Sequence, residues 1–387
     1  MGYQITQFYE PIAMHGDVRV VIDWEIRSFR IHHMHIENDA GKLIHVGGKT
    51  LCDYNRAGSP LMEIVTEPDF RSKADVLEYL KEIQKLMRWC GASDADMEKW
   101  QLRCDVNISL RKKWETVLNS RVELKNINSF SAIGRAIDAE YARQQELYDT
   151  WKTVDQETRG WNDEKGFSFS LRSKEDAMDY RYFPEPDLPP LLLTEGFIHD
   201  RILHELPIDR RMKYLTEYKL SEDDARILSQ NREISDFYEA LVRLTQDPKK
   251  SCSYITTVLF WIFLADPSTG TIETLPFPVE YLAQVIQLVN EDALASTNSK
   301  IVIETMFTSQ ETPDEIIDRL GLRQKNDTKA LEKIVDQVLA DSPAQIADYK
   351  SGKVNIFGFF VGQCMKLSKG QGNPKIFTDI LQKKLSE

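Results

Sequence analysis

The sequence predicts an α+β protein, in which a mostly antiparallel β-sheet domain precedes a helical region. Short segments of the first half alternate apolar and polar residues, as strands do when one face of a sheet is buried. From about residue 207, residues that cap helices precede runs in which apolar residues are three and four positions apart. A length of 387 residues is too great for one compact domain, so two or three domains are expected.

Residues 1–70 are expected to form strands. One alternating segment places five apolar residues on a single face: Val18, Val20, Ile22, Trp24 and Ile26. A second alternation, in RIHHMHIENDAGK, gathers imidazoles and carboxylates on one face: His33, His35, Glu37 and Asp39. Further along, Glu63 and Glu67 are four residues apart, which on a strand means the same face.

The segment QLRCDVNISLR, residues 101–111, predicts a strand with one apolar and one polar face. Its polar face carries two guanidiniums, a carboxylate, an amide and a hydroxyl: Arg103, Asp105, Asn107, Ser109 and Arg111. Such a row could hold a phosphate, a metal ion or a nucleotide. On this segment alone, the simpler interpretation is an exposed sheet face with compensating charges. Residues 121–130 are expected to form its partner strand.

Helices are expected over residues 73–90, ended by Gly91, and over residues 131–151. The segment 153–193 is irregular and then proline-rich, which predicts a stiff loop or a linker between domains. In the second half, three helix N-caps are expected: Ser221, Thr312 and Ser342.

Composition narrows the class of protein. A net charge of −12 disfavours wrapping of nucleic acid by the whole body, but residues 342–387 carry seven lysines against three acids, so this tail predicts one local anionic partner. Five widely separated cysteines indicate a reducing compartment, taken as the cytoplasm, and argue against structural zinc. The longest apolar run is far too short to cross a membrane.

Carboxylates interleaved with arginine and lysine on a sheet suit Mg²⁺-nucleotide chemistry, because Mg²⁺ binds hard oxygens and cations neutralise a transferred phosphoryl group. The sequence has no Walker loop and no G-x-G-x-x-G motif, so a P-loop or Rossmann protein is excluded. The histidines His32, His33 and His35 are interpreted as sheet residues rather than ligands. The residues alone therefore predict an antiparallel-sheet catalytic domain that could use a nucleotide.

Several long motifs carry a family resemblance: HIENDAGK, DYNRAGSPLMEIVTEPD, LRCDVNISLR, ELKNINSF, QETR, DYRYFPEPDLPPL and GFFVGQCMKLSKGQGNPK. With them the chain resembles the B subunit of the glutamine-dependent aspartyl/glutamyl-tRNA amidotransferase, the GatB family. The resemblance implies a glutamine-synthetase-like antiparallel sheet (the cradle domain), an all-α domain and a small helical tail domain. The expected bounds are 1–206, 207–324 and 325–387.

The resemblance also implies an activity. Members of this family phosphorylate the side-chain carboxylate of misacylated Glu-tRNA(Gln) or Asp-tRNA(Asn) with ATP and Mg²⁺, and ammonia then displaces the phosphate. The ammonia comes from the glutaminase, which is the A subunit of the complex, and the small C subunit joins the two. Two alternatives stay open: a non-catalytic tRNA-binding adaptor of the same complex, and an unrelated ATP-dependent carboxylate–amine ligase.

Residue roles follow from the motifs that the resemblance covers. The metal ligands implied are Glu37 and Glu63. Catalytic or channel-lining roles are expected for Glu37, Asn38, Arg103, Asp105 and Lys125. Nucleotide contacts are expected from Arg56, Asn107, Arg159 and Arg181. Contacts to tRNA are expected from Lys366 and Lys369, in the tail.

Two departures from the family pattern bear on these roles. Many members have a second glutamate where Asn38 stands, and asparagine offers an oxygen without the charge. Family members also carry an earlier segment with a Glu-x-His pair that helps bind the metal, and this sequence starts after it. The chain is therefore expected to be a fragment, to have a wrongly assigned start, or to be a compromised form of the protein.

Overall fold

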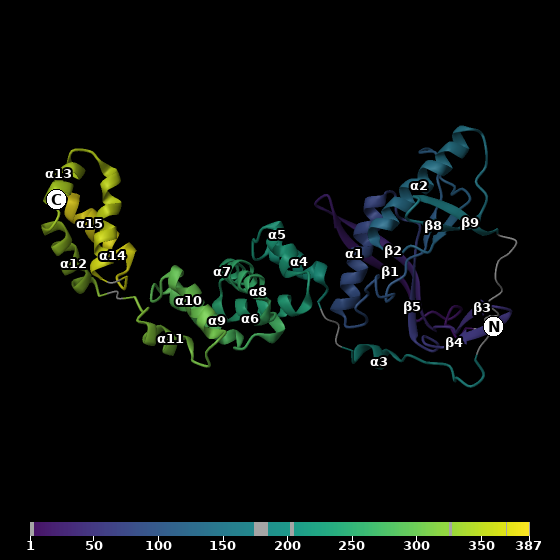
Figure 1. Cartoon of the computed structure of the whole chain (residues 1–387), viewed down its shortest axis with the longest axis horizontal. Helices are drawn as coiled ribbons and strands as arrows, with labels where there is room; N and C mark the ends of the chain where they lie inside the picture. The colour runs from purple at the N-terminus through teal and green to yellow at the C-terminus, as the bar shows by residue number, and fades with distance from the viewer. Residues whose placement is uncertain (1–3, 174–184, 202–204, 325–326, 369, 387) are drawn as a thin grey trace. The chain divides into compact units, whose positions relative to one another are not determined.

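The computed structural model describes residues 4–173, 185–201, 205–324, 327–368 and 370–386 (Figure 1). The chain forms two compact units, Met1–Ile208 and Asp209–Glu387. The first is mixed α/β with antiparallel sheets and the second is helical, so the predicted α+β class is confirmed. The finer division into domains 1–206, 207–324 and 325–387 stays a prediction.

The first unit contains three groups of paired strands within its described residues. One antiparallel sheet has the order β1-β2-β5, from Ala13–Ile22, Glu25–Asn38 and Pro60–Thr66. A separate hairpin pairs β3 with β4, Lys42–Val46 and Lys49–Asp53. The other sheet has the order β6-β7-β8-β9, from Val106–Ile108, Val122–Lys125, Glu157–Asn162 and Phe167–Ser173. In that sheet only the described pair β7–β8 is parallel.

Two helices cover one side of these strands. Helix α1 (Lys73–Trp89) begins with a capping box at Ser72, and α2 (Phe130–Asp149) is capped by Ser129. They contact each other, α1 contacts β1, and α2 contacts β6 and β9 (Figure 1). Both sheets and both helices contribute side chains to a single hydrophobic cluster. The sheet faces turned away from that cluster are therefore the ones left for chemistry.

The first 70 residues contain one more turn than the alternation predicts. Asp23 and Trp24 have φ of 51° and 70°, the left-handed values of a two-residue hairpin turn. The chain therefore reverses after Ile22, and Val18, Val20 and Ile22 are buried whereas Trp24 is 74% exposed. The prediction that Trp24 and Ile26 continue one strand face is wrong, because alternation alone does not mark a two-residue turn without glycine or asparagine.

The predicted strand 101–111 is also corrected. Only Val106–Ile108 pairs with a neighbour, as β6 against β7. The inward–outward alternation nevertheless extends upstream, since Leu102 and Cys104 pack against the hydrophobic cluster while Arg103 is exposed. Burial raises the pKa of the Cys104 thiol to about 12, so this cysteine is an inert core residue.

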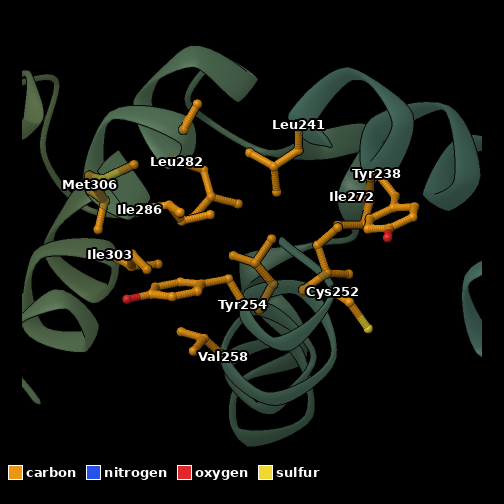
Figure 2. Close-up of a cluster of buried hydrophobic side chains, with 14 of the residues drawn as sticks. Tyr238, Leu241, Cys252, Tyr254, Val258, Ile272, Leu282, Ile286, Ile303 and Met306 are labelled. Carbon is orange, nitrogen blue, oxygen red and sulfur yellow. The ribbon is translucent and has the colours of Figure 1, made fainter. Parts of the chain in front are cut away.

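The second unit is built from short helices. A short helix, α3 (Glu195–His199), precedes the division between the units. The following helices are α4 (Pro207–Thr216), α5 (Glu222–Leu228), α6 (Arg232–Thr245), α7 (Pro248–Ser253), a π-helical stretch Tyr254–Leu259, α8 (Phe260–Ala265), α9 (Val279–Asn290), α10 (Ser296–Met306) and α11 (Pro313–Leu320). Their apolar faces form one cluster, part of which Figure 2 shows around Leu241, Tyr254 and Leu282.

Four further helices follow residues 325–326: α12 (Thr328–Ala340), α13 (Pro343–Lys350), α14 (Phe357–Leu367) and α15 (Pro374–Ser386). Helices α12, α14 and α15 supply the buried side chains of a separate cluster that includes Phe360 and Cys364. The predicted caps at Ser221 and Thr312 are confirmed, whereas Ser342 makes no side-chain capping bond. Among the described residues, no helix is long and apolar enough to cross a membrane.

Candidate functional site

The sheet β1-β2-β5 brings one histidine and two glutamates together. His35 on β2 is directly opposite Glu63 on β5, and Glu37 is two residues further along the same face of β2. The Nε2 atom of His35 is 3.5 Å from a carboxylate oxygen of Glu37 and 3.5 Å from one of Glu63. One ligand atom from each residue fits within 4.8 Å of the others.

An irregularity in the β-ladder aims these side chains away from the core. The pairing of β2 with β5 shifts between Ile31 and His33, and Ile31 packs against the hydrophobic cluster. Ile64 also packs there, so its neighbour Glu63 and the opposite residue His35 point to the other face. Because of this single inserted residue, alternate residues of β2 up to Ile31 point to the core, whereas His33, His35 and Glu37 point to the opposite face.

His35 is fully buried, and neither of its ring nitrogens has a hydrogen-bond partner among the described residues. Phe8 meets its ring edge-on at 5.7 Å, and His33 stacks on it at 5.4 Å. Burial lowers the pKa of His33, and the neighbouring imidazoles of His35 and His32 lower it further, so the His33 ring is neutral at pH 7. A buried imidazole without a partner is costly, which points to a ligand between His35 and the two carboxylates.

An imidazole nitrogen with two carboxylate oxygens is a donor set for a divalent cation, and the residues present fit one. The structure places the two expected ligands, Glu37 and Glu63, side by side. It also adds His35, which the sequence interpretation set aside as a sheet residue. The alternation of His33, His35 and Glu37 was a usable signal, but only the register with β5 shows that Glu63 is opposite.

The outward face of the sheet β6-β7-β8-β9 carries a row of charges. The Lys125 ammonium is 2.8 Å from the Asp105 carboxylate and 3.1 Å from that of Glu123. Thr158 donates a 2.9 Å hydrogen bond to Glu123, and the Arg103 guanidinium is 3.7 Å from Asp105. The expected grouping of Arg103, Asp105 and Lys125 is therefore present, with Glu123 as a further member.

Lys125 is a fixed cation in this row. Burial alone would lower the pKa of its ammonium, but the hydrogen bonds and charges of Asp105 and Glu123 outweigh burial and raise that pKa. The side chain therefore stays protonated at pH 7. It can hold or neutralise an anion, and it is not a general base in this arrangement.

Comparison with known proteins places the chain. Residues 1–199 match the GatB/GatE catalytic domain, and residues 236–385 match the GatB domain. The chain belongs to the GatB family. The resemblance inferred from the sequence motifs is confirmed.

Three relatives are named as the B subunit of an aspartyl/glutamyl-tRNA(Asn/Gln) amidotransferase. The protein of Persephonella marina is 41% identical over 99% of this chain and 81% of its own length. That of Nitrosococcus oceani is 41% identical over 100% of this chain and 82% of its own length. That of Clostridium acetobutylicum, numbered in its name as a second B subunit, is 38% identical over 100% of this chain and 82% of its own length.

Three other residues expected from the GatB resemblance take different positions relative to the two groups. Asn38 follows Glu37 on β2 and so faces the opposite side of the strand. Arg56 is exposed and pairs at 2.9 Å with Asp39. Asn107 lies on β6 opposite Glu123, at the margin of the charged row. Their catalytic or nucleotide roles stay predictions.

Arg159 is committed to the helix-covered face of its sheet. Its guanidinium donates to the Glu157 carboxylate at 2.7 Å, to the Ser168 hydroxyl at 2.8 Å and to the Ser168 carbonyl at 2.7 Å. The buried carboxylate of Glu140, on α2, is 3.9 Å away. This geometry gives Arg159 a structural task, and its expected nucleotide contact stays a prediction.

The remaining expected residues lie in or near segments whose placement is not described. Arg181 and Lys369 both lie outside the described residues. Lys366 is exposed near the C-terminal end of α14, where a lysine is also favoured by the helix dipole. Its expected contact with tRNA stays a prediction.

Proposed function

We propose that this chain is the kinase and amide-transfer component of a tRNA-dependent amidotransferase, a carbon–nitrogen ligase with glutamine as amido donor (EC 6.3.5.-). Its substrates would be misacylated Glu-tRNA(Gln), Asp-tRNA(Asn) or both. Relatives near 40% identity that are named as the B subunit of such an enzyme support this assignment. The structural observation that carries it is the buried His35, which lacks a hydrogen bond among the described residues and lies beside Glu37 and Glu63.

His35, Glu37 and Glu63 would hold a divalent cation, proposed as Mg²⁺. When bound, the cation would neutralise charge on the phosphates of ATP. The side chains do the positioning: Glu37 also accepts a 3.4 Å hydrogen bond from Thr6, and the ladder between β2 and β5 fixes Glu63 against His35. Because the proposed ligands are on two paired strands, the distances between them are fixed by the sheet and do not depend on the ordering of a loop.

The proposed reaction has two steps. An oxygen of the substrate's side-chain carboxylate attacks the γ-phosphorus of ATP, the bond to the bridging oxygen breaks, and ADP leaves with that electron pair. The nitrogen lone pair of ammonia then attacks the acyl carbon, inorganic phosphate leaves, and the surplus proton passes to water. Both steps handle highly anionic groups, so nearby cations lower the barrier.

The charged row on the β6–β9 sheet supplies suitable groups. Lys125 and Arg103 would neutralise the phosphoryl group, while Asp105 and Glu123 can accept hydrogen bonds from ammonia. Because Asp105 and Glu123 also keep Lys125 protonated, the row retains its cation at physiological pH. This division of labour agrees with the family pattern that assigns Arg103 and Asp105 to the strand lining the site.

The wider proposal covers partners and location. The chain would act with the glutaminase (A) and the small (C) subunits of the complex, and its basic tail would contact tRNA through lysines such as Lys366. A glutamine-synthetase-like cradle is proposed for the first unit, whose outward sheet faces would form the reaction chamber. All five cysteines are free thiols, as proposed for a cytoplasmic protein.

Substitution of Glu63 tests the proposal. In the complex with the glutaminase and the small subunit, Glu63→Gln should lower ATP-dependent amidation by about two orders of magnitude or more, because the cation loses an anionic ligand. Hydrolysis of glutamine by the glutaminase should continue. The assay measures amidated tRNA, ADP and glutamate in parallel.

Glu67→Gln is the matched control, since Glu67 follows the end of β5 and is outside the cluster. Normal amidation by Glu63→Gln would contradict the metal assignment. If the wild-type complex bound misacylated tRNA but showed neither amidation nor tRNA-stimulated ATP hydrolysis, the non-catalytic adaptor would replace the enzyme as the proposed function.

A further inference from the structure

The outward face of the β6–β9 sheet changes character at its β9 end. Ser168 faces α2, where its hydroxyl meets Glu140 and Arg159. Strand alternation therefore turns Phe167 and Phe169 to the outward face, where they are 46% and 40% exposed. Leu171, which is 46% exposed, follows them where the β8–β9 register shifts. Exposed apolar side chains beside a row of charges do not serve the core, so they call for another explanation.

Phe169 lies flat on the backbone of the next strand. Its register partner on β8 is Gly160, and a Cβ added to that glycine would be 2.8 Å from the Cζ atom of the Phe169 ring. Any side chain at position 160 would therefore push the ring away. Glycine here makes room for an aromatic plane, and its backbone needs no left-handed φ.

The same cross-strand row ends on the fixed cation. Lys125 pairs with Gly160, and Gly160 pairs with Phe169, so the three residues follow one another across β7, β8 and β9. At about 5 Å per strand, the Cα atoms of Lys125 and Phe169 are roughly 10 Å apart.

An aromatic plane with an ammonium group in the same cross-strand row suits a ligand that joins a flat ring to an anionic group. A protein surface would need a larger apolar area than two rings and one leucine beside a row of charges. A nucleotide meets both requirements, because its base stacks on an aromatic side chain and its phosphates pair with lysine and arginine.

We propose that Phe169, lying on Gly160, is the platform on which the adenine ring of ATP stacks. This inference rests on the proposed function, which requires ATP, and adds the position of its base. Phe167 is edge-on to Phe169, with ring centroids 6.5 Å apart, and only atoms of Phe169 are the near neighbours of Gly160, so Phe167 is not part of the platform. A base stacked there would be roughly 10 Å from Lys125, a distance that the sugar and phosphates of a nucleotide can span.

Phe169→Ala and Phe169→Leu are the test variants, and Phe167→Ala is the matched control on the same strand and face. In the complete complex, both Phe169 variants should raise the Kd for ATP by roughly tenfold, within the range that loss of one stacked base produces. Phe169→Trp should bind ATP at least as tightly as wild type. Phe167→Ala should change the Kd by about twofold or less, since it leaves the platform over Gly160.

Binding is measured by calorimetry with ATP and with inorganic triphosphate as probes. The Phe169 variants should bind triphosphate like wild type, since only the base contact is lost; an equal loss for both probes would overturn the platform. An unchanged ATP Kd in both Phe169 variants would also overturn it, as would an effect confined to the KM for aminoacyl-tRNA. A complex that binds ATP through Phe169 but never amidates tRNA would sink the proposed function and leave this inference standing.

Discussion

His35 is buried with both ring nitrogens lacking a hydrogen-bond partner in the described part of the chain. Leaving a buried polar group unsatisfied costs about 1–3 kcal/mol. The two nearest oxygens belong to Glu37 and Glu63, each 3.5 Å from Nε2. A cation shared by the three residues, as proposed, would remove the unsatisfied nitrogen and the repulsion between the carboxylates together, so metal binding would be coupled to local stability.

This coupling predicts that a divalent cation stabilises the first unit through His35. With metal at about 100 times its Kd, mass action adds about 2.7 kcal/mol to the free energy of unfolding of the wild-type protein. His35→Gln should lose most of that increment, because glutamine lacks the imidazole nitrogen. Thermal unfolding with and without Mg²⁺, and separately Mn²⁺, measures the increment in each variant.

His45→Gln, in the exposed hairpin β3–β4, is the control for loss of an imidazole away from the cluster. The comparison uses the increment that metal produces, so a lower starting stability of His35→Gln does not affect it. An undiminished increment in His35→Gln would place the cation elsewhere.

At the scale of residues, the sequence predicts which side chains belong to the site better than it predicts which of them lie next to one another. Alternation along β2 puts His35 and Glu37 on one face, and motif resemblance marks Glu63. The ladder that sets Glu63 opposite His35 depends on an inserted residue between Ile31 and His33, which no local pattern reveals. The proposed ligand set of His35, Glu37 and Glu63 could therefore be assembled only once the register of β2 with β5 was known.

At the scale of elements, helix α2 is joined to both ends of its sheet by a polar network. Its buried Glu140 accepts two hydrogen bonds from Arg143 and one from Gln144. Gln144 also binds the backbone of Ile108 and Leu110, just past β6. These contacts hold the helix against the short strand whose other face carries the charged row.

Glu157 on β8 belongs to the same network and gives it a pH dependence. Burial would raise the pKa of this carboxyl, but hydrogen bonds from Ser170 and Arg159 and the charges of Arg159 and Arg143 outweigh burial and lower the pKa. A carboxyl whose folded pKa is below its unfolded value stabilises the fold above the unfolded pKa, about 4.3, and loses that contribution as pH falls through the folded pKa.

Glu157→Gln should therefore lower the free energy of unfolding by about 1–3 kcal/mol at pH 7, and the difference from wild type should shrink as pH falls from about 5 to 3. Denaturant unfolding at about pH 3.5, 5 and 7 measures it. Glu146→Gln, at an exposed position on α2, should show a small, pH-independent difference. A Glu157→Gln deficit that is constant across these pH values would exclude an ionised Glu157 as its source.

Helices were easier to predict than strands for a physical reason. A helix satisfies its hydrogen bonds locally, so its apolar spacing and caps define it; α1 ends one residue before the predicted position, and Thr312 closes the predicted capping box. A strand needs a partner far away in sequence. Residues 101–105 alternate apolar and polar side chains, and their apolar side chains pack against the core, as in a strand. In this segment, however, only β6 pairs with a neighbouring strand.

At the scale of the whole molecule, an acidic body is combined with a basic tail. The net charge is −12, whereas residues 342–387 alone are +4, from seven lysines against three acids. Among the described residues, the hydrophobic cluster of α12, α14 and α15 shares no side chain with the cluster of helices α4–α11, although Gln371 donates a 3.0 Å hydrogen bond to the Gly321 carbonyl. Deletion of residues 325–387 is therefore expected to leave the buried side chains of the sheet unit and of the other helical core in place.

Because the tail has its own hydrophobic cluster, deletion of the tail is an informative last test. A chain ending at residue 324, assembled with the glutaminase and the small subunit, should bind tRNA more weakly and raise the KM for aminoacyl-tRNA by roughly tenfold or more. The reason is that each lysine–phosphate contact releases counterions on binding. Glutamine hydrolysis by the glutaminase should change little.

Salt dependence identifies the contacts that are lost. Each lysine–phosphate contact contributes a slope of about 0.7–0.9 to the fall of log K with log salt, so the deletion should flatten that slope by several such increments. Lys366→Ala in the complete chain should reduce the salt slope by about one such increment. Lys300→Ala, at an exposed position on α10, should leave the slope unchanged. If the shortened complex kept the full tRNA affinity and the full slope, the basic tail would not be the tRNA contact, and an anionic partner other than tRNA would explain its charge.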